Sequence, residues 1–283
     1  MRAGIDAMTA TVPTTRALVP IHGLSADRPL GAFFPIPCGK SARPTGRDNA
    51  VAVSNLGLPL DNKLLASLPR DDFDRLLPHL SSVQLPQGLV LFESGDEVDQ
   101  IYFPHYGMLS LLAVLRDGKA IETATVGREG VVGAMAGLGL YKSLVRVVVQ
   151  MPMACTKLAA THFRTAAAGS DPIRNLCIRY NEVLLSQARI TAACNALHMI
   201  EARFCRWLLQ TSKVSGTTTI TLTQEFLAEM LGVRRTSVTE VASKLQSAGL
   251  ISYSRGVINM LDLAGLREKS CECIETLQDQ KAI

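Results

Sequence analysis

Residues 222–262 read LTQEFLAEMLGVRRTSVTEVASKLQSAGLISYSRGVINMLD, two short helical patterns separated by a glycine. Thr223 is a good N-cap for the first helix, and Gly232 can adopt the left-handed conformation that ends a helix. A second helix is expected at 234–246, followed by two alternating strand patterns around Arg255. The order of helix, glycine turn, helix and two-stranded wing predicts a winged helix-turn-helix.

The polar side of the second predicted helix carries side chains suited to DNA. Recognition helices read base edges with their N-terminal residues, and an arginine can bond O6 and N7 of guanine together. We expect Arg235 to point towards a guanine, Arg234 to brace the backbone and Arg255 to meet a phosphate from the wing. The candidate DNA-binding residues are Thr223, Arg234, Arg235, Thr236, Ser237, Thr239, Glu240, Lys244 and Arg255.

Upstream of this region the patterns change to short strands. Residues 62–80 show short amphipathic helical pieces broken by Pro69 and Pro78. Strand patterns separated by glycine or polar turns then follow at roughly ten-residue spacing, which favours an antiparallel barrel or roll. Asp117 followed by Gly118 is a strong hairpin signal. We therefore expect an α+β protein with an N-terminal antiparallel β-roll, of the double-stranded β-helix or jelly-roll-like kind, over residues 56–170.

A long helix is expected at 171–195, between the roll and a winged-helix domain at 196–270. Asp171 and Pro172 suit the start of this helix, and Asn195 is expected to mark a hinge. Apolar residues at steps of three and four form a heptad-like seam that favours pairing with a second helix in a dimer. The alternative is an ordinary amphipathic helix on the roll. The seam residues are Ile173, Leu176, Tyr180, Val183, Gln187, Ile190, Cys194 and Leu197.

The chain ends and composition limit the other possibilities. Residues 1–55 are rich in proline and predict a flexible leader, or upstream sequence included in the frame, and 271–283 predict a short tail. The net charge is +4, which permits nucleic-acid binding. No run of 18 apolar residues and no convincing signal peptide occur, so neither a membrane partner nor export is expected. The seven irregularly spaced cysteines favour a reducing cytoplasm over a disulfide framework.

In motif order, residues 56–270 resemble the CRP/FNR family of bacterial transcription regulators. The segments VGREGVVG, LTQEFLAEMLGVRRTSVTE and CEC also resemble one subgroup of that family. The resemblance implies a homodimer that binds double-stranded palindromic DNA, contacts RNA polymerase and responds to a signal in the roll. It places Arg235 at the family's base-reading arginine. Thr236 and Glu240 replace a glutamate and a second arginine, which implies a different operator.

The family's known signals match this sequence poorly. A cyclic-nucleotide cassette would need a glutamate after Gly133, where Ala134 stands, so Gly133 and Arg146 are only a partial effector site. The cysteines do not supply an N-terminal iron–sulfur ligand set, and no cofactor and no metal site is predicted. Cys271 and Cys273 form a C-x-C pair that could respond to oxidants, but two ligands fall short of a structural zinc site.

Two other classes of function are weaker. No G-x-S-x-G and no H-E-x-x-H motif occurs, so the chain is not expected to be an enzyme. A regulatory protein-interaction module with a degenerate effector domain is the remaining alternative. The adjacent Arg234 and Arg235 argue against it, because such a module would not need them.

Overall fold

The computed structural model describes residues 61–279, and the predicted leader at 1–55 lies outside them. The described part starts with three short helical segments, α1 (Lys63–Ala66), α2 (Arg70–Leu76) and the 3-10 helix η2 (Leu77–His79). The two expected breaks are present, since Pro69 is the N-cap of α2 and Pro78 lies in η2. Asn62 caps α1 and anchors it to the roll by donating to the carbonyls of Pro104 and Gly130.

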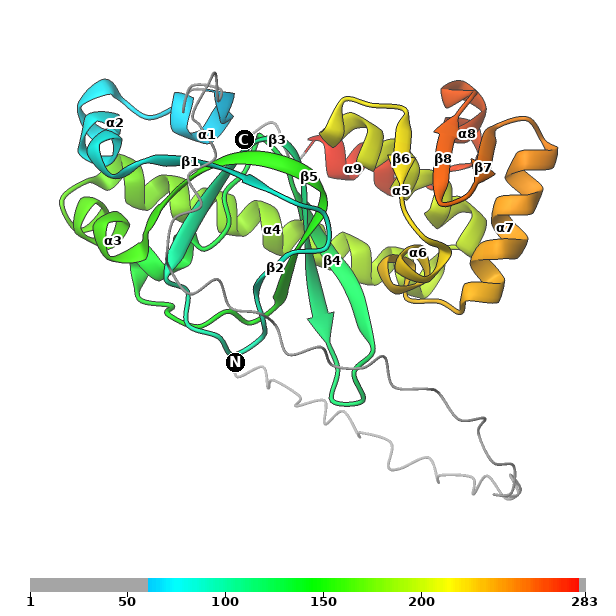
Figure 1. The fold of residues 1–283 in the computed structure, drawn as a ribbon, viewed down its shortest axis with the longest axis horizontal. Coiled ribbons are helices and arrows are strands. Elements are labelled where there is room, and N and C mark those ends of the chain that lie inside the picture. Colours follow the sequence, from blue (N-terminus) through cyan, green and yellow to red (C-terminus); the bar gives the residue numbers. More distant parts are fainter. Residues whose placement is uncertain (1–60, 280–283) are drawn as a thin grey trace, which may run out of the picture. The chain divides into compact units, whose positions relative to one another are not determined.

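The predicted antiparallel roll is confirmed (Figure 1). Its order is β1-β5-β3-β4, and β2 pairs with β5. Strand β5 is longer than the expected ten-residue spacing, with 14 residues, and Gly118 takes a φ of 84° in the predicted hairpin turn. The elements of the roll are β1 (Ser81–Leu85), β2 (Val90–Phe92), β3 (Gln100–Val114), β4 (Ala120–Val126), η3 (Ala134–Leu138) and β5 (Arg146–Ala159).

Three helices follow the roll: α3 (Ala160–Ala168), α4 (Asp171–Leu197) and α5 (Ile200–Ser215). Ser170, not Asp171, caps α4, because its hydroxyl accepts from the backbone N–H of Ile173 at 3.1 Å. The helix also continues through Asn195, and the break lies at His198 and Met199, whose backbones are extended. Helix α3 was not expected from the sequence.

The heptad-like seam of α4 packs within its own chain, as the alternative interpretation required. Gln187 is 1% exposed, accepts a hydrogen bond from the backbone N–H of Thr125 at 3.2 Å and donates to its carbonyl at 3.4 Å. Gln187 therefore lies in the interior of its own chain, and the seam is not a face that is free to pair with a second helix. Periodicity identified the buried face of the helix, but that face contacts β4 and η3. The buried seam residues are Ile173, Leu176, Tyr180, Val183, Gln187 and Cys194.

The C-terminal part has the order expected of a winged helix, with a three-stranded sheet of order β6-β8-β7. Residues 271–279, expected as a polar tail, include a helix whose side chains Ile274 and Leu277 are buried. This last helix contacts both α4 and α5. The elements are β6 (Thr219–Thr221), α6 (Gln224–Leu231), α7 (Arg235–Ser247), β7 (Ile251–Ser254), β8 (Val257–Met260), α8 (Leu263–Lys269) and α9 (Cys273–Asp279).

Buried polar side chains connect strand β4 of the roll to helix α5. The indole N–H of Trp207 donates to Glu122 at 3.0 Å, and the Ser110 hydroxyl donates to the same carboxylate at 2.6 Å. One helical turn further, the amide of Gln210 donates to the hydroxyl of Thr125 at 3.0 Å. These bonds matter because a buried polar group without a partner is costly. Among residues 61–279, no helix is long and apolar enough to cross a membrane.

The hydrogen bonds between Gln187 and the backbone of Thr125 should stabilise the fold. Gln187→Leu should lower the free energy of unfolding by about 1–3 kcal/mol, because it leaves the buried N–H and C=O of Thr125 without partners. Urea unfolding measures this. The matched control is Gln246→Leu, which removes a single exposed bond to Tyr253 N–H and should change stability by less than about 0.5 kcal/mol. Unchanged stability together with a tighter dimer for Gln187→Leu would show that Gln187 lies at a subunit interface.

Candidate nucleic-acid interface

Helix α6 and the following turn position the candidate recognition helix. The Thr223 hydroxyl accepts from the Phe226 N–H at 3.1 Å, which confirms the predicted N-cap. Gly232 ends the helix in the left-handed region with φ 62°. A Cβ at Gly232 would collide with the Ile121 side chain on β4, so this turn needs glycine both for its φ and for its close approach to the roll.

Helix α7 begins at Arg235, one residue later than expected, and Arg234 takes the N-cap position without a side-chain cap. The helix buries Val238, Val241, Ala242 and Leu245. Because these four residues occupy one side of the helix, the opposite side faces solvent. Thr236 and Glu240 lie near the centre of the exposed side, and Ser243, which sequence reasoning did not select, is exposed there one turn further on.

Arg235 and Thr239 lie on the flank of α7 that adjoins the start of α6. The Arg235 guanidinium is 3.6 Å from the Glu225 carboxylate, and both side chains are mostly exposed. The Thr239 hydroxyl lies 2.9 Å from Gln224 Oε1, its acceptor. An exposed ion pair of this kind contributes only about 0–1 kcal/mol. Arg235 can therefore exchange Glu225 for a base or a phosphate at small cost.

Ser237 and Lys244 lie on the other flank of α7, beside the start of α5. With Glu240 they line a shallow depression whose far wall includes Ile200 and Glu201. Lys244 pairs with Glu240 at 2.9 Å across one helical turn. The predicted DNA-binding residues of α7 thus lie on two flanks and on the exposed centre between them, and only the Arg235 flank adjoins α6.

The wing has the predicted form. Strands β7 and β8 pair in register from Ile251 with Met260 to Ser254 with Val257, leaving Arg255 and Gly256 at the tip. Arg255 is exposed and has φ 50°, the one positive φ of a non-glycine residue among residues 61–279. Within that described range no carboxylate forms an ion pair with Arg234 or Arg255. Both guanidinium groups are free to meet an anion.

The two residues proposed for an effector each have structural contacts. Gly133 has φ 87° at the start of η3, and a Cβ there would lie 2.8 Å from the Gln100 carbonyl. Arg146 pairs with Glu93 at 2.8 Å and lies 4.0 Å from Glu229 of α6. These contacts explain both residues without a ligand, and their effector role stays a prediction.

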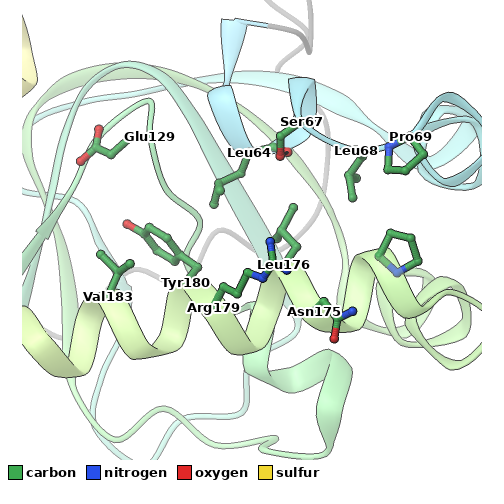
Figure 2. Close-up of a pocket in the computed structure, with 11 residues that line it drawn as sticks. Leu64, Ser67, Leu68, Pro69, Glu129, Asn175, Leu176, Arg179, Tyr180 and Val183 are labelled. Carbon is green, nitrogen blue, oxygen red and sulfur yellow. Dashed lines mark hydrogen bonds between the residues drawn. The ribbon is translucent and has the colours of Figure 1, made fainter. Parts of the chain in front are cut away.

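A separate pocket of about 330 Å³ lies between the α1 region and α4 (Figure 2). Leu64 and Leu68 line one side, and Leu176, Arg179 and Tyr180 project from α4 on the other. Burial raises the pKa of Tyr180, so its phenol stays protonated. The pocket includes neither Gly133 nor Arg146, so it is not the cassette site that the sequence suggested.

One group of side chains among residues 61–279 could hold a metal ion: Cys194, His198, Cys271 and Cys273. The sequence singled out Cys271 and Cys273 alone. Cys194 and His198 are four residues apart at the end of α4, a spacing that places two side chains on one face of a helix. Both pairs are visible in the sequence, but they are 77 residues apart and no local pattern shows that the fold brings them together.

Comparison with known proteins agrees with this architecture. A model for the cyclic nucleotide-binding domain matches residues 82–169, and a model for the Crp-like helix-turn-helix domain matches residues 202–269. Among curated proteins, none matches the sequence.

Solved structures show the same fold at low sequence identity. A protein from Eubacterium rectale, described as a transcriptional regulator of the CRP/FNR family, has a TM-score of 0.61 and 18% identity over 77% of this chain and 99% of its own. The c-di-GMP responsive global regulator CLP from Xanthomonas campestris has a TM-score of 0.57 and 19% identity over 69% and 100%. A CRP-family transcriptional regulator from Thermus thermophilus has a TM-score of 0.57 and 19% identity over 66% and 96%.

The two domain models together match more than half of the chain, and they occur in the order that the fold requires. The roll corresponds to the first model, and the segment from α5 to α8 corresponds to the second. The chain therefore belongs to the CRP/FNR family and is a DNA-binding transcription regulator.

Proposed function

We propose that the protein binds a palindromic operator as a homodimer, with α7 of each subunit in the major groove, and regulates transcription through RNA polymerase in the bacterial cytoplasm. The observation that carries the proposal is the exposed Arg235 at the first residue of α7, beside α6 and with an unpaired arginine at the wing tip. A recognition helix reads bases from this end. The protein is proposed to act by binding and not by catalysis.

The predicted contacts fall into two kinds. Arg235, Thr236 and Thr239 are proposed to face base edges, because they lie on the exposed side of the first turns of α7. Thr223, Arg234 and Arg255 are proposed to hold phosphates, since they lie at helix starts and at the wing tip.

Ser237, Glu240 and Lys244 complete the proposed contact residues. Glu240 lies near the centre of the exposed side of α7, and Ser237 and Lys244 lie on the flank beside α5. Glu240 has a lowered pKa because it accepts a hydrogen bond from Lys244 and lies beside its charge. An ionised carboxylate repels phosphate but can accept from the N4 amine of cytosine. A carboxylate at this position therefore favours a cytosine in the operator, whereas an arginine would favour a guanine.

The homodimer is proposed to form through the solvent-exposed face of α4, opposite the buried seam. Ile178 is 57% exposed and Leu185 is 41% exposed, seven residues apart on one side of the helix. Ala192 continues the same stripe and is also exposed. Apolar residues at heptad spacing are the pattern of a helix pair, and two copies of α4 would bury them against each other.

The roll is proposed to sense a signal whose chemistry is open. The contacts of Gly133 and Arg146 give a cyclic nucleotide no support in this chain. A redox response remains the alternative for Cys271 and Cys273, because both sulfurs lie close to a third cysteine.

Base reading and phosphate binding can be separated with two substitutions. Arg235→Lys keeps the charge but loses the paired bonds to guanine, so discrimination against a changed base pair should fall by about 10- to 100-fold per half-site. Arg255→Asn removes a charge and tolerates the positive φ of this position. It should weaken binding to all duplexes and reduce the log–log salt slope by about one per subunit.

Both effects are measured by fluorescence anisotropy at several salt concentrations. The two duplexes are an operator selected from a random DNA library and a scrambled version of it. Leu144→Asn, at an exposed residue of the roll, is the control and should change neither. The assignment is wrong if Arg235→Lys leaves the discrimination between the two duplexes unchanged, or if Arg255→Asn weakens binding to only one of them.

The proposed dimer face makes an independent prediction. Leu185→Asp should convert the dimer to monomer and weaken operator binding by more than about tenfold, because two charges would be buried at the helix pair. Sedimentation velocity measures the oligomeric state. Leu144→Asp is the matched control, since Leu144 is 72% exposed on the roll, and should leave the dimer intact. A Leu185→Asp protein that remains dimeric would place the interface elsewhere.

A further inference from the structure

Four potential metal ligands meet at the turn between α4 and α5. Cys194 lies in the last turn of α4 and His198 is its C-cap, while Cys271 and Cys273 flank the start of α9. Their ligand atoms all lie within 4.8 Å of one another. Cys194 and Cys271 are 77 residues apart in sequence, so the fold itself assembles this group.

The distances match a tetrahedral site. A zinc ion with Zn–S bonds of about 2.3 Å and Zn–N bonds of about 2.05 Å separates two sulfurs by about 3.8 Å, and a sulfur and a nitrogen by about 3.6 Å. The Cys194 and Cys271 sulfurs are 3.5 Å apart, and Cys273 Sγ is 3.6 Å from His198 Nδ1. An iron–sulfur cluster would fit less well, because its ligands bind different irons and stand further apart.

The outer nitrogen of His198 has the partner that a metal-bound histidine needs. His198 Nε2 is 3.2 Å from the Glu272 carboxylate, while Nδ1 faces the sulfurs. A proton on Nε2 donated to Glu272 leaves the Nδ1 lone pair directed towards the thiols. Carboxylate–histidine–zinc arrangements of this kind orient the ring and raise its basicity.

The surroundings provide positive charge for an anionic centre. Zinc with three thiolates and a neutral imidazole carries a net charge of −1. Arg203 and Arg206 of α5 are 7% and 5% exposed, and neither makes an ion pair with a carboxylate within residues 61–279. The nearby Cys194 thiol interacts electrostatically with both guanidinium groups. A negative centre would offset the cost of burying these two charges.

The other described cysteines stand in a different setting. Burial raises the pKa of each of the Cys155, Cys177 and Cys205 thiols to about 12, as expected for cysteines that act as small apolar side chains. None of these three belongs to the group at the α4–α5 turn, where three sulfurs and a histidine nitrogen lie within 4.8 Å of one another. A closed metal site requires several ligand atoms gathered in this way.

We propose that Cys194, His198, Cys271 and Cys273 bind one Zn²⁺ in a closed Cys₃His site. Soft thiolates with one imidazole in a tetrahedral arrangement favour zinc over hard cations. All four positions are filled by protein atoms, so the ion is structural and not catalytic. It joins α9 to the end of α4, next to the break that connects the long helix with the winged-helix domain.

Metal analysis of the full-length protein, purified without chelators, tests the site directly. One zinc per chain is expected, and Cys271→Ser, Cys273→Ser and His198→Asn should each lose it. Cys205→Ala, at a buried cysteine outside the group, is the matched control and should retain it. Wild-type protein that contains no zinc and binds none on titration overturns the proposal.

Cobalt substitution keeps the test valid if the variants fail to fold. Wild-type protein loaded with Co²⁺ should show the intense visible absorption of tetrahedral cobalt and a sulfur-to-metal charge-transfer band. A weak, octahedral-type spectrum overturns the site. A Cys194–Cys271 disulfide in protein isolated without oxidant also overturns it, since that bond removes two ligands.

Glu272→Gln tests the positioning role, with zinc affinity expected to fall by about tenfold at unchanged stoichiometry. An unchanged zinc affinity would show that Glu272 does not position His198.

Chelation should also release α9 from the end of α4, and trypsin would report this release as faster cleavage after Arg267 or Lys269. Unchanged cleavage would contradict the proposed link between α9 and α4. Arg235→Ala should keep its zinc, so failure of the DNA-binding proposal and failure of the zinc proposal can be told apart.

Discussion

The buried carboxylate of Glu122 on β4 constrains how the roll and the C-terminal domain fit together. It accepts the indole N–H of Trp207 from α5 at 3.0 Å and the Ser110 hydroxyl from β3 at 2.6 Å. Thr125 on the same strand binds Gln187 of α4 and Gln210 of α5. A shift of either helix along β4 would break several buried hydrogen bonds at once, and each broken bond costs about 1–3 kcal/mol. One strand therefore sets the register of both helices.

This arrangement links the parts that the proposed function uses. Helix α4 carries the proposed dimer face on its outer side and contacts β4 on its inner side. Helix α5 starts the winged-helix domain and contacts β3. Gly232, at the turn before the recognition helix, lies against Ile121 of β4. A signal that displaced β4 would act directly on the helix with the proposed dimer face, on the start of the DNA-binding domain and on the turn before α7.

Local signals in the sequence predicted local structure well, whereas contacts between distant segments were harder to predict. The cap at Thr223 and the left-handed conformation of Gly232 were both predicted, because each depends on a few neighbouring residues. The seam of α4 was identified as buried, but periodicity cannot show whether Gln187 meets Thr125 or a second subunit. Likewise the visible C-x-C pair could not be placed beside the end of α4, nor Arg146 beside its two glutamates. These contacts join residues more than 50 positions apart.

Selection of bound duplexes from a random DNA library by the full-length protein tests the central claim most directly. A dimer with α7 in two successive major grooves should enrich an inverted repeat whose half-sites lie about 10 base pairs apart. Each half-site should contain a fixed guanine that becomes variable when the selection is repeated with Arg235→Lys. An absence of enrichment, an asymmetric single site, or the same motif from both proteins would contradict the account.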